Sequence, residues 1–359
     1  MNIIHLPIEL LEERYSQQWY YWFNSYINQN NINAINVLPD MGWNSKIENG
    51  QFLDVIKTNM FKAQQLVTVT QLVDEGRVNE HTVFFLMDAW FPGLEMLAYI
   101  RDAMDVPFKI AGIFHAGTWD QYDYLTQCGM RSWGQFCERA WFEILDAIFV
   151  ATNFHKKLII ENSTMIQKCN LNLTDKIHVT GLPIYPNFVK EIKKENIVVF
   201  PHRLAFEKQP DLFDHLAMTL KDQFPHWQFI KTKDVCSTKQ EYYDLLNRAK
   251  IAVSFAQQET FGISMIEATL CGCLPIVPNR LSYQELYPQN FQVFTLAPFC
   301  HSEVDLITIH TACMCQVFDE YQNCEKELKL YKDLQDLRKY FIELGSNAIP
   351  NMFSIMESL

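Results

Sequence analysis

Short apolar runs alternate with longer amphipathic segments along most of the chain. The runs are rich in β-branched and aromatic residues, and several are continuously apolar, as strands buried on both faces are. They predict strands at 2–7, 32–39, 82–89, 108–116, 147–152 and 176–183, and again at 196–201, 227–232, 251–256, 273–278 and 291–296. Helices are expected between most of them, including 9–28, 52–75, 133–146, 211–224, 239–249 and 263–271. This alternation predicts an α/β fold with parallel sheets and right-handed crossovers.

The segment YPNFVKEIKKEN (185–196) divides the predicted elements into two sets. A chain of 359 residues is long for one hydrophobic core and comfortable for two. We therefore expect a doubly wound, Rossmann-like domain over 1–187 and a second one over 196–335, facing each other across a cleft. Residues 336–359 are expected to form a C-terminal helix that packs back toward the first domain.

Composition and charge exclude several classes of protein. Hydrophobic residues make up 48% of the chain and charged residues 20%, which is typical of a globular protein. Neither a secretion signal nor an apolar run of membrane-spanning length is present, so a cytoplasmic protein without a membrane span is expected. Ten cysteines without a C-x-x-C pair predict neither disulfides nor a zinc site. The net charge of −12 opposes nucleic acid binding unless a local basic patch overrides it.

Polar residues directly after strands are the natural candidates for a site, because doubly wound sheets bind ligands beyond the carboxyl ends of their strands. The familiar phosphate-binding loops are missing. No two of the twelve glycines stand in G-x-G spacing, and the chain has no P-loop. A nicotinamide dehydrogenase or a P-loop kinase is therefore not expected.

The sequence QQETFGISMIEA (257–268) places Glu259 at the end of one strand and Gly262 at the start of a helix. A helix N-terminus of this kind binds anions such as a diphosphate through its free amides. Those amides belong to Phe261, Gly262, Ile263 and Ser264. Glu259 would accept hydrogen bonds from sugar hydroxyls beside the phosphates, and Glu267 would hold another pair of hydroxyls farther along. The alternative is that Glu259 caps the helix and Glu267 lies on a solvated face.

A second strand end carries two cations. Arg203 follows the strand at 196–201, and Lys208 stands five residues later, before the next helix. The planar fork of Arg203 and the point charge of Lys208 suit a pyrophosphate. The alternative, taken for this segment alone, is a capping loop with exposed charges.

These residues resemble the donor domain of GT-B glycosyltransferases, specifically the retaining group with an E-x7-E motif. Glu259 and Glu267 match that motif, and Arg203 and Lys208 match the Arg/Lys pair that holds the donor diphosphate. FPHRLAFEKQPDLF (200–213) and EATLCGCLPIVPNRLSYQELYP (267–288) are similar to the tRNA-queuosine mannosyltransferase family. The resemblance covers about 196–290, and more loosely 110–155 through FHAGTWDQYDYL.

The opening of the chain departs from the usual GT-B pattern. HLPIELLEERYSQQW (5–19) stands where these enzymes commonly place a glycine-rich loop after their first strand. This opening resembles glycosyltransferases of tailed bacteriophages that decorate hypermodified DNA bases, for example by arabinosylation of hydroxymethylcytosine. A phage-encoded enzyme would act in the host cytoplasm.

The first half supplies candidates for the acceptor side. His115 follows a strand, and the resemblance implies that it contacts the transferred sugar near its anomeric carbon; a structural hydrogen bond is the alternative. Asp88 ends another strand and could orient an acceptor hydroxyl or cap a turn. The start of the first helix could meet phosphate through Glu13, Arg14 and Tyr15, or simply be solvated. Trp119 could stack on a sugar or base, although packing explains most aromatic residues.

The resemblance implies retaining transfer of a sugar from a UDP- or GDP-linked donor to a hydroxyl by a front-face mechanism. His115, Glu259, Arg203 and Lys208 would be its catalytic residues. The resemblance points to a modified base in DNA or RNA as the acceptor, and a small molecule, a lipid or a polysaccharide stays open as the alternative. Asp120 and Asp123 form D-x-x-D rather than D-x-D, so no obligatory metal is expected. Two alternatives stay open: a nucleotide-sugar epimerase or hydrolase on the same fold, and a non-catalytic nucleotide-sugar-binding protein.

Overall fold

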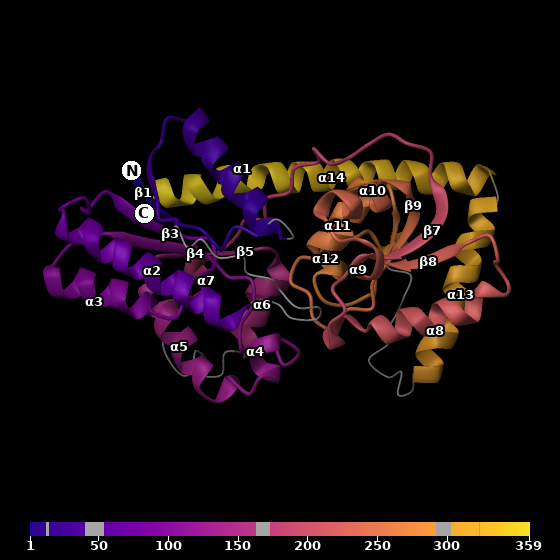
Figure 1. Cartoon of the computed structure of the whole chain (residues 1–359), viewed down its shortest axis with the longest axis horizontal. Coiled ribbons are helices and arrows are strands. Elements are labelled where there is room, and N and C mark those ends of the chain that lie inside the picture. The colour runs from indigo at the N-terminus through magenta and orange to yellow at the C-terminus, as the bar shows by residue number, and fades with distance from the viewer. Residues whose placement is uncertain (12–13, 40–53, 163–172, 292–302, 323) are drawn as a thin grey trace. The chain divides into compact units, whose positions relative to one another are not determined.

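A computed structural model describes residues 1–11, 14–39, 54–162, 173–291, 303–322 and 324–359 (Figure 1). The chain divides into two compact units, one formed by Met1–Pro183 with Asn347–Leu359 and the other by Ile184–Ser346. Most of the strand predicted at 291–296 lies outside the described residues. Each of the other ten predicted strands corresponds to a strand in the structure, and the predicted α/β class is confirmed.

The first unit contains a six-stranded parallel sheet with strand order β2-β1-β3-β4-β5-β6. Its strands are β1 (Asn2–Leu6), β2 (Asn33–Asn36), β3 (Thr82–Leu86), β4 (Lys109–Ile113), β5 (Ala147–Val150) and β6 (Ile177–Val179). Its helices are α1 (Tyr15–Gln29), α2 (Val55–Asp74), α3 (Leu94–Met104), α4 (Tyr124–Gln127), α5 (Arg131–Ile144), α6 (Asn153–Asn162) and α7 (Leu173–Lys176). The helix predicted at 9–28 begins only at Tyr15, after an extended Arg14.

The second unit contains a four-stranded parallel sheet with strand order β10-β9-β7-β8. Its strands are β7 (Glu195–Phe200), β8 (Gln228–Lys231), β9 (Ala249–Val253) and β10 (Leu274–Ile276). Its helical elements are η1 (Phe206–Lys208), α8 (Pro210–Lys221), α9 (Thr232–Val235), α10 (Lys239–Arg248), α11 (Ile263–Leu270), α12 (Tyr283–Leu286), η2 (Gln289–Phe291) and α13 (Glu303–Gln322). Helix α14 (Cys324–Glu357) begins in this unit, and its residues from Asn347 on belong to the first unit. Strands β7 and β9 are neighbours, so their carboxyl ends meet at one edge of the sheet.

Alternating side chains give the sheet of the first unit two buried faces. Phe84 of β3 belongs to a core cluster that includes Val69 of α2, Leu97 of α3 and Phe142 of α5. The next residue, Phe85, points to the opposite face. The runs at these strands are continuously apolar because both faces of the parallel sheet are covered.

The end of α14 packs on this second face of the first sheet. The ring of Phe353 lies 4.9 Å from Tyr26 of α1, 6.3 Å from Phe23 and 6.4 Å from Phe85, measured between ring centroids. The helix is 34 residues long and begins at Cys324, twelve residues before the predicted start. Among the described helices, none has a stretch that is both long and apolar enough to cross a membrane.

Replacing Phe353 by Ala should destabilise the first unit by about 3–5 kcal/mol, because its fully buried ring would leave a cavity between α1 and the sheet. Urea unfolding followed by tryptophan fluorescence suits this test, since seven of the eight tryptophans lie in residues 1–183. Tyr331→Ala on the same helix is the control: its side chain is 62% exposed, so the free energy of unfolding should change by less than about 0.5 kcal/mol. Equal effects of the two changes would contradict this packing.

Candidate functional site

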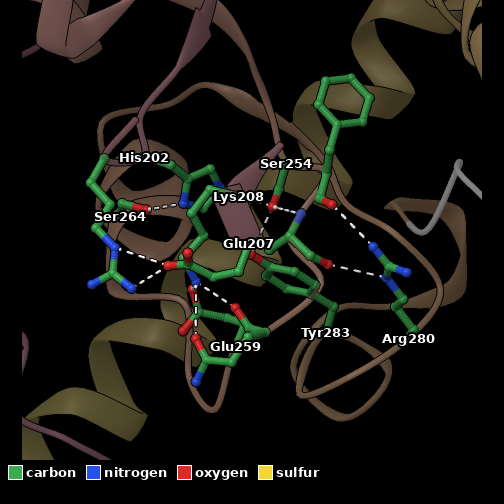
Figure 2. Close-up of polar contacts among 12 residues, drawn as sticks. His202, Glu207, Lys208, Ser254, Glu259, Ser264, Arg280 and Tyr283 are labelled. Atoms are coloured by element: carbon green, nitrogen blue, oxygen red, sulfur yellow. Dashed lines mark hydrogen bonds and ion pairs between the residues drawn. The ribbon is translucent and has the colours of Figure 1, made fainter. Parts of the chain in front are cut away.

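The loops that follow β7 and β9 meet in the second unit (Figure 2). The backbone amide of Gln257 donates to the carbonyl of Glu207 at 2.7 Å, which ties one loop to the other. The structure thereby brings together two of the predicted site residues, Lys208 and Glu259, as an ion pair, and a third, Arg203, pairs with Glu207 of the same loop as Lys208. Adjacent parallel strands are the reason, since both loops leave the sheet at the same edge.

Lys208 is the most buried cation of this group, with 6% of its surface exposed. Its ammonium donates to Glu259 Oε2 at 3.1 Å and to the backbone carbonyl of Gln258. The local chain explains its position. Lys208 ends the short helix η1, Gln209 takes a left-handed conformation with φ of 56°, and Pro210 then starts α8 with its preset φ.

Arg203 pairs with a carboxylate that the sequence analysis did not single out. Its Nε donates to Glu207 Oε1 at 3.0 Å, and its Nη2 donates to the same oxygen. The site therefore holds two cations and two carboxylates: Arg203 with Glu207, and Lys208 with Glu259. An acidic residue four positions after an arginine was a usable signal, because that spacing often places two side chains on one side of a helical turn.

Glu259 is held in its ionised form. Burial alone would raise the pKa of its carboxyl group, but the charge of Lys208 and the amide of Gly262 outweigh burial, and the net shift is downward. Gly262 has a left-handed φ of 83°, and a Cβ there would lie 3.0 Å from the ring of Tyr283. A side chain at this position would therefore be both strained and crowded.

Helix α11 starts beside these charges. Gly262 is its N-cap and contributes no side chain, and the first intrahelical hydrogen bond runs from the Ile266 amide to the Gly262 carbonyl. The amides of Ile263 and Ser264 precede that bond, as the predicted anion site requires. Phe261 is buried and 2% exposed, so its side chain packs in the core.

A chain of hydrogen-bonding side chains lies beneath this helix start. His202 contacts Ser254 Oγ through Nε2 at 2.8 Å and Ser264 Oγ through Nδ1 at 3.1 Å. Ser254 Oγ also lies 2.9 Å from the hydroxyl of Tyr283. Burial, followed by the nearby charge of Lys208, lowers the pKa of His202 to about 3, so its ring is neutral near pH 7.

Glu267 belongs to a different set of contacts from Glu259. Its carboxylate is 5% exposed and accepts hydrogen bonds from Lys239 Nζ at 2.9 Å, Tyr243 Oη at 2.7 Å and Tyr242 Oη at 2.9 Å. All three donors come from α10. The alternative of a solvated Glu267 is therefore wrong, and burial, together with the Glu267 charge, raises the pKa of Tyr242 well above its usual value.

Arg280, which follows β10, closes the loop after β9. Its Nε donates to the carbonyl of Ala256 at 3.1 Å, and its Nη2 donates to the carbonyl of Phe255 at 3.0 Å. Three strand ends are thus tied together at the site. Sequence spacing offered no signal for this role, because the partners of Arg280 are backbone carbonyls about 25 residues away.

In the first unit, His115 Nε2 contacts the carbonyl of Met87 at 2.7 Å, and its ring lies 5.7 Å from Tyr15 and 5.3 Å from Trp19. Burial lowers the pKa of His115, although the nearby Asp88 charge opposes the shift. Asp88 accepts a hydrogen bond from Lys62 Nζ at 3.0 Å. Lys62 was not among the predicted residues.

The remaining candidates of the first unit have different surroundings. Arg14 is the N-cap of α1, and Tyr15 is its first residue. Glu13 lies outside the described residues. Trp119 is 4% exposed and packs against Phe114 and Phe142 in the core. Its ring therefore serves packing.

Asp120 and Asp123 accept hydrogen bonds from backbone amides two residues later, at 2.9 Å in each case. Both carboxylates therefore shape local turns, and Asp123 is the N-cap of α4. In the parts of the chain that the structure describes, no group of three or more His, Cys, Asp or Glu side chains is arranged to hold a metal ion.

Comparison with solved structures defines the class of fold. Sucrose-phosphate synthase from Thermosynechococcus elongatus superposes with a TM-score of 0.68 at 12% identity, covering 100% of this chain and 99% of that one. WaaG, a glycosyltransferase involved in lipopolysaccharide biosynthesis, gives 0.58 at 11% identity over 98% and 99% of the two chains. Pneumococcal O-GlcNAc transferase GtfA, solved with UDP and GlcNAc, gives 0.54 at 14% over 79% and 60%. The predicted GT-B fold is confirmed.

Comparison of the amino-acid sequence with characterised proteins identifies a particular relative. The chain is 33% identical over 86 residues to the tRNA-queuosine alpha-mannosyltransferase of Drosophila melanogaster. The match covers 24% of this chain and 21% of that relative, so it spans about a fifth of the relative's length. The predicted resemblance to tRNA-queuosine mannosyltransferases is confirmed over that stretch. No family model matches the chain.

The buried neutral His202 should make stability depend on pH. In the unfolded chain its pKa is about 6.5, so between pH 6.5 and 3 the unfolded state binds more protons and acid favours unfolding. The stability gained by keeping this ring neutral is present above pH 6.5 and is lost as the pH falls. In urea titrations from pH 7 to 4.5, His202→Asn should reduce the slope by up to about 1.4 kcal/mol per pH unit.

His226→Asn is the matched control, because His226 lies in the same unit with an exposed side chain. It should leave the slope unchanged. An equal slope for the native chain and His202→Asn would show that His202 does not titrate differently in the folded and unfolded states.

Proposed function

We propose that this protein is a glycosyltransferase that moves a sugar from a nucleoside diphosphate sugar to a hydroxyl group. The observation that carries the proposal is the buried Lys208 ammonium, bonded to Glu259 beside the start of α11. Arg203 stands five residues before Lys208 in the loop after β7 and pairs with Glu207. Cations, a helix N-terminus and a carboxylate therefore stand together on a GT-B fold, where a diphosphate and a sugar need them.

The charges of the site suit a diphosphate. The two cations are already balanced by Glu207 and Glu259, so they are oriented without a ligand. An arriving diphosphate would gain the amides at the start of α11 and would share the donors of Arg203 and Lys208. The same groups would stabilise the charge that develops on the leaving phosphate as the sugar bond breaks.

The two glutamates would hold hydroxyls at different places on the donor. Glu259 would fix the transferred sugar next to the phosphates. Glu267 already accepts three hydrogen bonds, and a carboxylate has about four acceptor positions, so one position remains for a ribose or sugar hydroxyl. The motif favours a retaining, front-face reaction in which the leaving phosphate oxygen takes the proton of the acceptor.

On the acceptor side we propose His115 and Asp88. A neutral His115 would position the sugar near its anomeric carbon, and Asp88, held by Lys62, would orient the acceptor hydroxyl. The acceptor class that we favour is a modified base in nucleic acid. The name of the Drosophila relative, which refers to queuosine in tRNA, supports this choice, and so does the resemblance of the opening to phage enzymes that act on hydroxymethylcytosine in DNA.

Replacing Lys208 by Met should weaken binding of UDP or GDP by roughly 10- to 100-fold, because a hydrogen bond to a charged group contributes about 1.5–3 kcal/mol. Isothermal titration calorimetry with UDP, GDP and ADP would measure the change. Lys250→Met is the control. Lys250 is the second residue of β9, whereas Glu259 lies in the loop that follows the carboxyl end of the same strand. Equal affinities for the native chain and Lys208→Met would refute the assigned phosphate site.

Glu259→Gln should reduce sugar transfer by at least 100-fold while nucleotide binding stays within a few-fold, since the amide keeps the shape but loses the charge that grips the sugar. The assay would supply labelled UDP- and GDP-sugars with queuosine-containing tRNA and with hydroxymethylcytosine DNA. Nuclear magnetic resonance of the product would report whether the anomeric configuration is retained. Release of free sugar without an acceptor would instead indicate a hydrolase, and binding without turnover would indicate a binding protein.

A further inference from the structure

Four side chains in the second unit form one continuous line of hydrogen bonds. Tyr283 of α12 contacts Ser254 after β9, Ser254 contacts His202 after β7, and His202 contacts Ser264 in the first turn of α11 (Figure 2). Tyr283 and Ser254 are fully buried, and His202 is 3% exposed. Only Ser264, which is half-buried, reaches the helix start where the proposed diphosphate would bind.

The hydrogen bonds of this line can all point in one of two directions, depending on which ring nitrogen of His202 carries the hydrogen. A neutral histidine donates through one ring nitrogen and accepts through the other. If Ser254 donates to Nε2, then Nδ1 carries the hydrogen and donates to Ser264 Oγ. If Nε2 carries the hydrogen instead, Nδ1 accepts from the hydroxyl of Ser264. Only in the first arrangement is the hydroxyl hydrogen of Ser264 available to an anion.

The chemistry at Ser254 favours the first arrangement. The amide of Ala256 donates to Ser254 Oγ at 3.3 Å, so the serine oxygen already acts as an acceptor. A phenol is a better donor and a poorer acceptor than an aliphatic hydroxyl, because its oxygen shares electron density with the ring. Tyr283 therefore donates to Ser254, whose own hydrogen then goes to His202.

The two distances at the ring agree with this direction. The contact from His202 Nε2 to Ser254 is 2.8 Å, and the contact from Nδ1 to Ser264 is 3.1 Å. A short contact suits a hydroxyl that donates to the unprotonated imidazole nitrogen, which is the strongest neutral acceptor in the line. The longer one lies within the range of an N–H group that donates to a hydroxyl oxygen.

We propose that His202 is a positioning residue whose Nδ1–H tautomer, fixed by Tyr283 through Ser254, turns the hydroxyl of Ser264 toward a phosphate bound at the start of α11. The phosphate is that of the nucleoside diphosphate, so this part of the inference rests on the proposed function. Ser264 then adds one directed donor to the amides and cations of the site. Every hydrogen bond of the line forms while the ring of His202 is neutral. The Ser264 hydroxyl is therefore directed toward the phosphate site without protonation of the histidine.

The tautomer can be measured on the protein without any ligand. Nitrogen-15 NMR of histidine-labelled protein distinguishes a protonated from an unprotonated ring nitrogen, and the loss of signals in His202→Asn would assign the resonances. We expect hydrogen on Nδ1 and none on Nε2. In Tyr283→Phe the first donor is lost, and the two tautomers should mix. Hydrogen on Nε2 in the native chain would overturn the inference.

The effect on the phosphate is measured by UDP affinity. Ser264→Ala should weaken UDP about tenfold, and Tyr283→Phe about threefold. The double variant should bind no more weakly than Ser264→Ala alone, because Tyr283 acts only through Ser264. Tyr287→Phe is the control, because it removes the hydroxyl of a neighbouring buried tyrosine. The ring of Tyr287 lies 5.7 Å from that of Tyr283, and the change should leave the UDP affinity unchanged.

The two proposals fail in different ways. If UDP binds but Ser264→Ala binds it equally well, or if the effects of Ser264→Ala and Tyr283→Phe simply add, the positioning role is wrong while the donor site stands. If the protein binds none of UDP, GDP and ADP, the proposed function and the claim about phosphate both fall. The NMR result would still show which tautomer the line of hydrogen bonds imposes.

Discussion

The ammonium of Lys208 is the group on which the geometry of the second unit depends. A lysine with 6% of its surface exposed is costly unless its charge is paired and its hydrogens are bonded. Glu259 and the carbonyl of Gln258 meet that requirement, and both come from the loop after the neighbouring strand. The two loops must therefore stay together, since separating them would leave a charge buried alone.

Other contacts extend the same constraint. Arg280 fixes the loop after β9 from the third strand end, and the amide of Gln257 fixes it to Glu207. Donors that are already oriented can stabilise developing charge without reorganising. The site is thus rigid for electrostatic reasons, and the parallel order of β7, β9 and β10 makes that rigidity possible.

The sequence could predict what depends on local pattern. Continuous apolar runs located the strands, because both faces of each sheet are buried, and the residues after those runs located Arg203, Lys208 and Glu259. Helix α3 escaped prediction because apolar side chains surround it: Tyr99 is 76% exposed and Met104 is 56% exposed, which hides the period of its buried face. For Trp119 the sequence predicted too much: it was a candidate for stacking on a sugar or base, and only the folded structure reveals that its ring packs in the core.

Partners from distant segments could not be predicted for a different reason. His202 lies in the segment 200–213, in which only Arg203 and Lys208 were predicted to be site residues. Its role depends on Ser254, 52 residues later in the chain. Lys239 and its two tyrosine neighbours lie on a helix that was correctly predicted, yet nothing in their spacing connects them to Glu267. Such contacts follow from strand order and helix packing, which a single sequence does not specify.

The spacing of the two glutamates now has a structural reason. Glu259 precedes Gly262 and lies at the sheet edge, whereas Glu267 is the fifth residue of α11, about 6 Å along the helix axis from Ile263. Each meets a lysine from a different element, Lys208 from the loop after β7 and Lys239 from α10. A helix start flanked by two separately anchored carboxylates keeps both at fixed positions relative to the same amides. A shorter spacing would bring the two anions toward one cation, and one of them would then be buried without a partner of its own.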